Sequence, residues 1–96
     1  MDLSKNTFDE RLALPGEFLV DFWADWCQPC KTMLPVLEKV NSEIMPVYKV
    51  NVEEQRVLTM EYQVRSIPTM IIFSNGVEVK RIVGSQTFEN MKKELT

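Results

Sequence analysis

The sequence contains no histidine and only two cysteines, Cys27 and Cys30. Without histidine the chain cannot form a serine–histidine or cysteine–histidine nucleophile pair, and it has no imidazole to bind a metal ion. A c-type haem attachment is excluded for the same reason, because Lys31 follows Cys30. Two cysteines are also too few for a closed zinc site of four ligands within one chain. We therefore expect no metal site.

Long apolar runs and clusters of positive charge are also missing. No stretch approaches the about 18 apolar residues of a membrane span, and the first residues lack the pattern of a secretory leader. We therefore expect a cytoplasmic protein that does not bind membranes. Scattered basic residues and a formal net charge of −3 argue against binding to nucleic acid. The length of 96 residues and the hydrophobic content of 45% predict one globular domain over residues 1–96, which we expect to be monomeric.

Apolar segments alternate along the chain between strand-like and helix-like spacing. Runs rich in β-branched and aromatic residues predict strands over residues 18–23, 47–52, 70–73 and 77–83. Helical spacing predicts helices over residues 7–14, 33–44, 53–62 and 88–95, with Val57 and Met60 on the apolar side of the third. Asn75-Gly76 predicts a tight turn, because it supplies the positive φ angles of a primed hairpin, and the broken alternation at residues 80–81 predicts a bulge. This order predicts an α/β protein with a central mixed sheet and helices on both faces.

The segment Cys27-Gln28-Pro29-Cys30 follows a predicted strand and opens a predicted helix. Its spacing brings two sulfur atoms close enough to interconvert between a dithiol and a disulfide. The free N–H groups and partial positive charge at the start of a helix favour a thiolate, which is the nucleophile of disulfide exchange. Pro29 suits the first turn of a helix, where its missing N–H costs nothing. We therefore predict Cys27 as the attacking nucleophile, and Cys30, which lies deeper in the helix, as the resolving thiol.

The motif alone leaves two other interpretations open. The cysteines could form a purely structural disulfide, although a reducing compartment argues against one. They could also supply half of a zinc site that is shared between two chains. The residues that flank the motif decide between these two interpretations and a redox-active pair.

The flanking residues closely resemble the active-site segment of the thioredoxin family. This match runs over residues 20–31, VDFWADWCQPCK. Pro35 stands where thioredoxins have the proline that kinks the active-site helix, and Ile67-Pro68-Thr69 resembles their cis-proline loop. Residues 49–52 resemble the family's third strand, and residues 73–76 and 83–84 resemble its terminal hairpin. The resemblance therefore covers nearly the whole chain, in order.

The resemblance implies a thioredoxin fold with a shortened N-terminal strand, because only residues 1–4 remain to form it. It also implies a protein-disulfide reductase whose partners are disulfide-containing substrate proteins. Such reductases are recharged by thioredoxin reductase, a flavoprotein that uses NADPH, so we expect the same electron donor here. No bound cofactor is implied, since the redox-active group is the Cys27–Cys30 disulfide itself.

Asp21 lies inside the apolar run of residues 18–23. Burial of an unpaired carboxylate is costly and raises its pKa, whereas an aspartate at a strand end more often reaches water. In thioredoxins the matching acid is buried and is thought to exchange a proton with the resolving cysteine. The resemblance therefore implies that Asp21 takes and returns the proton of Cys30, with Lys49 as the lysine near this acid.

The proline loop and its neighbours are implied to bind substrate. Only about one X–Pro bond in twenty is cis, so residue statistics favour a trans bond before Pro68, whereas the resemblance implies a cis bond. A cis Pro68 would leave the Ile67 backbone free to pair with an extended substrate segment. For Ile67 and the valines, packing in the core is an equally good interpretation, and we expect Trp23 to be structural. The implied substrate-binding positions are Trp26, Val52, Ile67, Pro68, Val83 and Gly84.

Two positions depart from the usual thioredoxin pattern. Gln28 replaces the glycine that thioredoxins usually have between the cysteines, and Ser66 stands where a glycine is common. We expect Gln28 and Pro29 to tune the relative stability of dithiol and disulfide. Three other functions stay open: a non-catalytic interaction module with an idle dithiol, an oxidase or isomerase of an oxidising compartment, and a glutaredoxin that uses glutathione. Pro29 and the missing leader argue against the second, and the buried Asp21 argues against the third.

Overall fold

A mixed four-stranded sheet forms the centre of the fold. The computed structural model describes residues 2–96; Met1, part of the segment expected to form the N-terminal strand, lies outside them. The strands are β1 (Glu17–Trp23), β2 (Val47–Asn51), β3 (Thr69–Ser74) and β4 (Val77–Val83), in the spatial order β2-β1-β3-β4. β1 runs parallel to β2 and antiparallel to β3, and β4 is antiparallel to β3. The predicted central mixed sheet is therefore confirmed.

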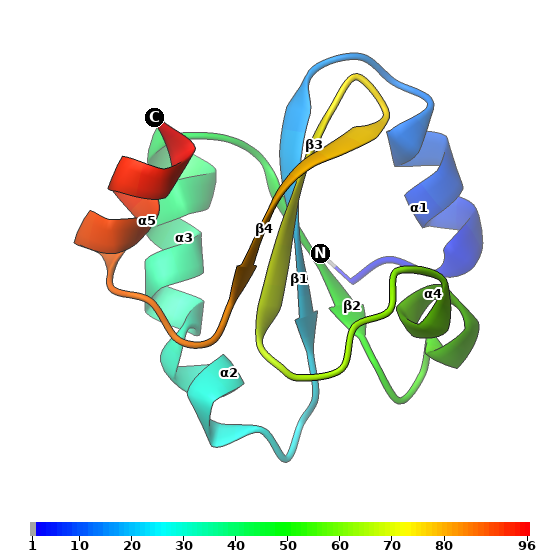
Figure 1. The fold of residues 1–96 in the computed structure, drawn as a ribbon, viewed down its shortest axis with the longest axis horizontal. Coiled ribbons are helices and arrows are strands. Elements are labelled where there is room, and N and C mark those ends of the chain that lie inside the picture. Colours follow the sequence, from blue (N-terminus) through cyan, green and yellow to red (C-terminus); the bar gives the residue numbers. More distant parts are fainter. Residues whose placement is uncertain (1) are drawn as a thin grey trace.

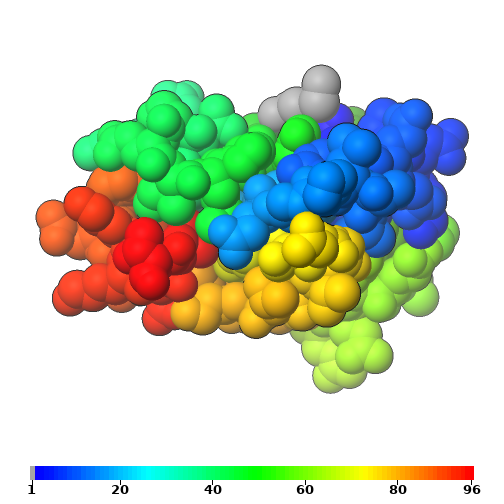
Figure 2. All heavy atoms as spheres, turned by 90° about the horizontal axis from the view of Figure 1, so that it is seen from above, coloured from blue at the N-terminus to red at the C-terminus, as the bar shows by residue number. Residues whose placement is uncertain are grey.

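Helices cover both faces of the sheet, as Figure 1 shows. They are α1 (Lys5–Leu12), α2 (Gln28–Thr32), α3 (Leu34–Glu43), α4 (Arg56–Glu61) and α5 (Phe88–Leu95). One core lies between the sheet and the pair α1 and α4, and it contains Phe8, Phe18, Phe22, Leu58 and Phe73. A second core, with four buried methionines, lies under α3 and α5 and contains Met33, Leu37, Met45, Met70 and Met91. Figure 2 shows the two helix layers at opposite ends of the molecule, with the β3–β4 turn between them.

Strand alternation fixes which residues of β1 face each core. Phe18, Val20 and Phe22 belong to the core under α1 and α4, and Leu19 belongs to the core under α3. Because successive strand residues point to opposite faces, Asp21 lies on the same face as Leu19. The Asp21 carboxylate therefore lies on the side of the sheet where the helix that follows Cys27 packs.

Within residues 2–96, the N-terminal segment joins the sheet through an isolated bridge at Lys49. Asp2 forms an isolated parallel bridge with Lys49, and the Leu3 N–H donates to the Lys49 carbonyl oxygen at 2.6 Å. The Leu3 side chain is buried. After it, Ser4 and Thr7 form a capping box that starts α1 at Lys5, two residues before the predicted start. The expected shortened N-terminal strand is confirmed, in the form of this single bridge.

The helix that follows the cysteines is interrupted. α2 ends at Thr32 and α3 begins at Leu34, with Met33 as the cap of both. Pro35 lies in the first turn of α3, where a proline is tolerated because that turn has no helical partner for its N–H. The break is at the place where the resemblance implies a kink.

Three local predictions needed correction. Val57 and Met60 do not pack into the core, since they are 68% and 76% exposed, and Leu58 is the buried residue of α4. α4 begins at Arg56 rather than at residue 53, because the Asn51 side chain accepts the Glu53 and Glu54 N–H groups and holds a turn there. The bulge of β4 lies one residue earlier than predicted: Phe73 pairs with Glu78 and Ile72 with Lys80, which leaves Val79 without a partner.

Candidate active site

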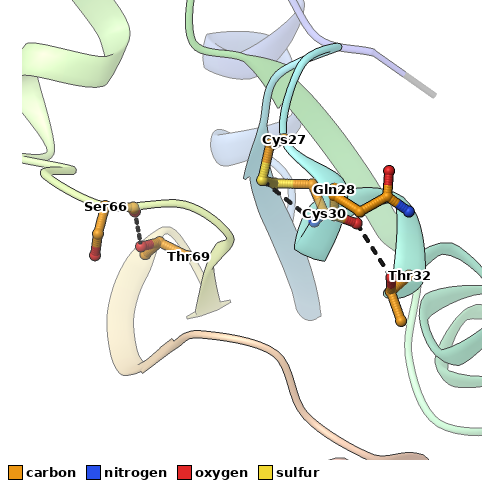
Figure 3. Close-up of a disulfide and its surroundings, with 6 residues drawn as sticks. All are labelled: Cys27, Gln28, Cys30, Thr32, Ser66 and Thr69. Atoms are coloured by element: carbon orange, nitrogen blue, oxygen red, sulfur yellow. Dashed lines mark hydrogen bonds between the residues drawn. A yellow bond between two sulfur atoms is a disulfide. The ribbon is translucent and has the colours of Figure 1, made fainter.

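The two cysteines form a disulfide at the start of α2. Cys27 is the N-terminal cap of this helix, and its sulfur accepts a hydrogen bond from the Cys30 backbone N–H at 3.2 Å. The Cα atoms of the pair are 5.3 Å apart, which is an ordinary distance for a disulfide. Figure 3 shows the bond between Cys27 and Cys30, with Gln28 pointing away from it. The sequence motif therefore folds as predicted, with one sulfur at a helix start and the other in its first turn.

The disulfide lies just below the surface. Cys27 is 4% and Cys30 is 2% exposed, and both pack with the buried Ala24. Trp26, the residue before Cys27, is by contrast 67% exposed. Gln28 and Pro29 are also exposed. The pair is thus shielded from solvent by apolar atoms, while an aromatic ring next to it stays open to solvent.

The loop between α4 and β3 lies against the cysteines. The Ile67–Pro68 peptide bond is cis, as the resemblance implies, and the Ile67 side chain packs on the cluster of Ala24, Cys27 and Cys30. The Thr69 hydroxyl braces the loop by donating to the Ser66 carbonyl oxygen at 2.6 Å (Figure 3). No backbone hydrogen bond joins Ile67 to another residue of the described part of the chain. The Ile67 amide group is therefore available to a partner.

The end of β4 completes this side of the site. The Gly84 N–H donates to the Pro68 carbonyl oxygen at 2.8 Å, so Gly84 is tied to the proline loop. Gly84 has φ +95°, and apart from Gly84 and its two chain neighbours no residue has an atom within 4 Å of where its Cβ would be. Val83 is 55% exposed. The backbone conformation, rather than lack of space, therefore favours glycine at position 84.

The predicted substrate-binding residues differ in how they are placed. Val52 and Ile67 are partly buried and contact the cysteine cluster. Trp26 and Val83 are exposed, and Pro68 is buried. The fold therefore packs Val52 and Ile67 against the cysteines, ties Gly84 to Pro68 next to Ile67, and leaves the Trp26 and Val83 side chains exposed.

Asp21 is completely buried. Within residues 2–96, neither oxygen of its carboxylate has a hydrogen-bond partner. Burial raises the pKa of Asp21 from its ordinary value of 3.8 to about 7, with a further increase from the charge of Asp2 and an opposing decrease from Lys49. The sequence-based expectation of a buried carboxyl with a raised pKa is therefore confirmed.

Lys49 is the direct neighbour of Asp21 on β2. Its ammonium lies 4.4 Å from the centre of the Trp23 ring, in a cation–π contact. Among the described residues, no ion pair within 4.0 Å joins Lys49 to Asp21. Lys49 therefore lowers the pKa of Asp21 through its charge, without forming an ion pair with the carboxylate.

Sequence reasoning missed three groups around the site. The Trp23 indole N–H donates to the Asp2 carboxylate at 3.0 Å, and the Gln86 N–H donates to the Met33 sulfur at 3.1 Å. The third is the bracing Thr69 hydroxyl. Only Thr69 had a local signal, as the polar residue that follows Ile67-Pro68. The contacts of Asp2 and Gln86 join distant segments, so nothing in the local sequence could reveal them.

A metal centre has no support in the described chain, where no group of three or more potential ligands was found. No helix within residues 2–96 has the length and apolar character needed to cross a membrane.

A disulfide at a helix start, packed against a cis-proline loop on a mixed α/β sheet, is typical of thiol–disulfide oxidoreductases. The thioredoxin family model matches residues 1–96, and the chain belongs to the thioredoxin family. It is accordingly a protein-disulfide oxidoreductase, and the disulfide Cys27–Cys30 is its redox-active group.

Individual relatives agree with this assignment. The chain is 38% identical over 98 residues to a thioredoxin of Alicyclobacillus acidocaldarius, covering 99% of this chain and 93% of that protein. It is 47% identical over 92 residues to a bifunctional thioredoxin reductase/thioredoxin of Mycobacterium leprae, covering 93% of this chain but only 20% of that longer protein. A solved structure of a mutant thioredoxin from Halobacterium salinarum superposes with a TM-score of 0.90 at 32% identity, covering 98% of this chain and 87% of that one.

Proposed function

We propose that this protein reduces disulfide bonds in other proteins, with Cys27 as the nucleophile and Cys30 as the resolving thiol. One observation carries the assignment of roles: the Cys30 N–H donates to the Cys27 sulfur, and this contact stabilises negative charge on Cys27 in the reduced state. Within residues 2–96 the Cys30 sulfur accepts no equivalent hydrogen bond, and Cys30 is slightly more buried than Cys27. The thiolate therefore forms at Cys27.

The reaction takes place in two exchange steps. The Cys27 thiolate attacks one sulfur of the substrate disulfide, a mixed disulfide forms, and the other substrate sulfur leaves as a thiolate that takes up a proton. Cys30 then loses its proton and attacks the Cys27 sulfur, which releases the second substrate sulfur as a thiolate that also takes up a proton. The substrate gains two electrons and two protons, and the protein is left with the Cys27–Cys30 disulfide.

Asp21 is the group that takes the proton of Cys30 in the second step and returns it during recharging. With a pKa raised to about 7, it is close to half-protonated at neutral pH, which is the best condition for a group that both accepts and donates. Its lack of hydrogen bonds within residues 2–96 leaves its oxygens free to receive a proton. Lys49 lowers the pKa of Asp21 in opposition to burial, so that part of the carboxyl population is ionised at neutral pH and can accept the proton.

Substrate binds across the proline loop. An extended segment of the substrate pairs with the open backbone of Ile67 beside Pro68, and Trp26, Val52, Val83 and Gly84 supply the surrounding surface. The exposed Trp26 and Val83 side chains lose water when substrate docks, which contributes to affinity. Gln28 and Pro29, between the cysteines, set the balance between dithiol and disulfide.

The protein needs an external electron donor and no bound cofactor. The donor we propose is thioredoxin reductase, a flavoprotein that draws on NADPH. In support, the Mycobacterium leprae relative is named as a reductase and a thioredoxin in one chain. We further propose that residues 1–96 act as one domain and as a monomer, in the cytoplasm, where a reducing environment maintains the dithiol.

The test is turnover of a protein disulfide, such as those of insulin, with a dithiol as electron donor. Cys30→Ser is expected to accumulate mixed disulfides with the substrate, which are visible on a non-reducing gel, because the second exchange step is lost. Cys27→Ser is the matched control and is expected to trap nothing. Equal trapping by both variants would contradict the assigned roles. If the wild type shows no turnover, the alternative of a non-catalytic interaction module is supported.

A further inference from the structure

The N-terminal segment reaches the sheet beside Asp21. β1 and β2 pair in a register that puts Lys49 opposite Asp21, and Asp2 forms its parallel bridge with this same Lys49. The Leu3 N–H donates to the Lys49 carbonyl oxygen at 2.6 Å. The backbone of Lys49 is thus held between Asp21 on one side and the Asp2–Leu3 segment on the other.

The side chains of this neighbourhood form a chain of contacts that starts at Asp2. The Asp2 carboxylate accepts the Trp23 indole N–H at 3.0 Å, which holds the ring. The Lys49 ammonium lies 4.4 Å from the centre of that ring. Asp21, Trp23 and Lys49 point to the same face of the sheet by strand alternation and register. The contacts therefore run from the Asp2 carboxylate to the Trp23 ring, and from the ring to the Lys49 ammonium.

Among the residues that the structure describes, this arrangement leaves the Asp21 carboxylate without a hydrogen-bond partner. Its two oxygens accept no hydrogen bond from any described residue. An ammonium in direct contact would hold a buried carboxyl in its charged form, so a lysine that paired with Asp21 would prevent it from accepting protons near neutral pH. The Lys49 ammonium instead makes its contact with the Trp23 ring and forms no ion pair with Asp21.

We propose that Asp2 is a positioning residue for Asp21: by holding the Trp23 indole, it keeps the Lys49 ammonium on the ring and out of an ion pair with Asp21. This inference rests on the role of Asp21 set out above and adds to it the device that keeps the carboxyl able to take up a proton.

Few other charges act on Asp21. Among residues 2–96, two charged groups shift the pKa of Asp21: Lys49 on β2 lowers it, and Asp2 in the N-terminal segment raises it. β3 places Met70 opposite Asp21, and α3 contributes the apolar Leu37 and Val40 to the same layer. From α2 the neighbouring titratable group is Cys30, which titrates only when the disulfide is reduced. Glu38 of α3 is exposed and is not among the charges that shift Asp21.

The experiment follows the Asp21 carboxyl directly, by its ¹³C resonance against pH in the oxidised protein, where no thiol titrates. Asp21→Asn identifies the resonance. Asp2→Ala removes both the charge and the hydrogen-bond acceptor, and we expect the titration midpoint of Asp21 to fall by about 1 pH unit. Asp2→Asn removes the charge but keeps an oxygen that can accept the indole N–H, and we expect a smaller fall. Glu10→Gln, at an exposed position on α1, is the control for net charge and is expected to leave the midpoint unchanged.

The outcomes separate this inference from the proposed function. An unchanged midpoint in Asp2→Ala, or equal falls in Asp2→Ala and Asp2→Asn, would overturn the positioning role, the latter because it would mean that charge alone acts. If the midpoint moves as expected but the acid limb of the pH–turnover profile does not move with it, the positioning of Lys49 stands and the proton-acceptor role of Asp21 is wrong. Parallel movement of both supports the two together.

Discussion

Replacement of Asp21 by asparagine offers a quantitative test of the buried carboxyl. The pKa of Asp21 is raised from 3.8 to about 7 on folding. Below pH 3.8 the carboxyl is protonated in both states, so it contributes no pH-dependent penalty. Between pH 3.8 and 7 the unfolded chain releases the proton while the folded protein keeps it, so stability falls as the pH rises; above pH 7 the loss is complete. A difference of about 3 pH units corresponds to about 4 kcal/mol.

Asp21→Asn removes this loss, because an amide has no charge to bury. We therefore expect the stability of the variant relative to wild type to increase by up to about 4 kcal/mol between pH 4 and pH 8. Burial of an amide without hydrogen-bond partners also lowers the stability of the variant, but by the same amount at every pH. It therefore does not change how the stability difference between variant and wild type depends on pH. The measurement is the free energy of unfolding in urea at a series of pH values, with both proteins oxidised.

Asp25 provides the matched control, because it is an exposed aspartate two residues before Cys27. Asp25→Asn should follow the wild-type pH dependence closely. If the curves of Asp21→Asn and wild type run parallel across this pH range, Asp21 titrates as a solvated carboxyl, and both its burial penalty and its role as a proton acceptor near pH 7 are refuted.

Other changes test the surroundings of the disulfide and the orientation of α4. Trp26→Ala should change the unfolding free energy by less than about 0.5 kcal/mol but lower kcat/KM for a protein disulfide, since the ring is exposed in the free protein; equal loss with a small disulfide substrate would argue against docking. Gly84→Ala should cost about 1 kcal/mol in thermal or chemical unfolding, because φ is +95° there and the space is open; an unchanged stability would refute this strain. Leu58→Ala should cost about 2–5 kcal/mol, whereas Met60→Ala should be nearly neutral, and similar costs at the two positions would contradict the observed orientation of α4.

The sequence was most informative where local pattern and chemistry coincide. The four strands could be placed to within one residue at either end, because each is a short apolar run bounded by turns. The Cys27–Cys30 site could be predicted because the spacing, Pro29 and the preceding strand all indicate the start of a helix. Burial of Asp21 followed from its position inside an apolar strand.

α4 shows why other features could not be predicted. Two apolar stripes run along this helix, one through Val57 and Met60 and the other through Leu58 and Tyr62. Both have helical spacing, and the choice between them depends on the ring of Phe8, which packs on Tyr62 at a centroid distance of 5.4 Å. Residue 8 lies far away in sequence, so no local pattern could decide which stripe is buried. The Asp2–Trp23 contact was hidden for the same reason.

The unpaired Val79 in β4 has a consequence for how the molecules behave in concentrated solution. β4 is an outer strand of the sheet, and its exposed valines would otherwise present a flat apolar ribbon to a neighbouring molecule. The extra residue breaks the regular spacing of backbone donors and acceptors, and Arg81 and Lys80 beside it are engaged by Glu78 and Glu94. A strand of another molecule therefore cannot form a continuous ladder of backbone hydrogen bonds with β4, and it meets charged side chains along this edge. Both features oppose fibril growth from this side of the sheet.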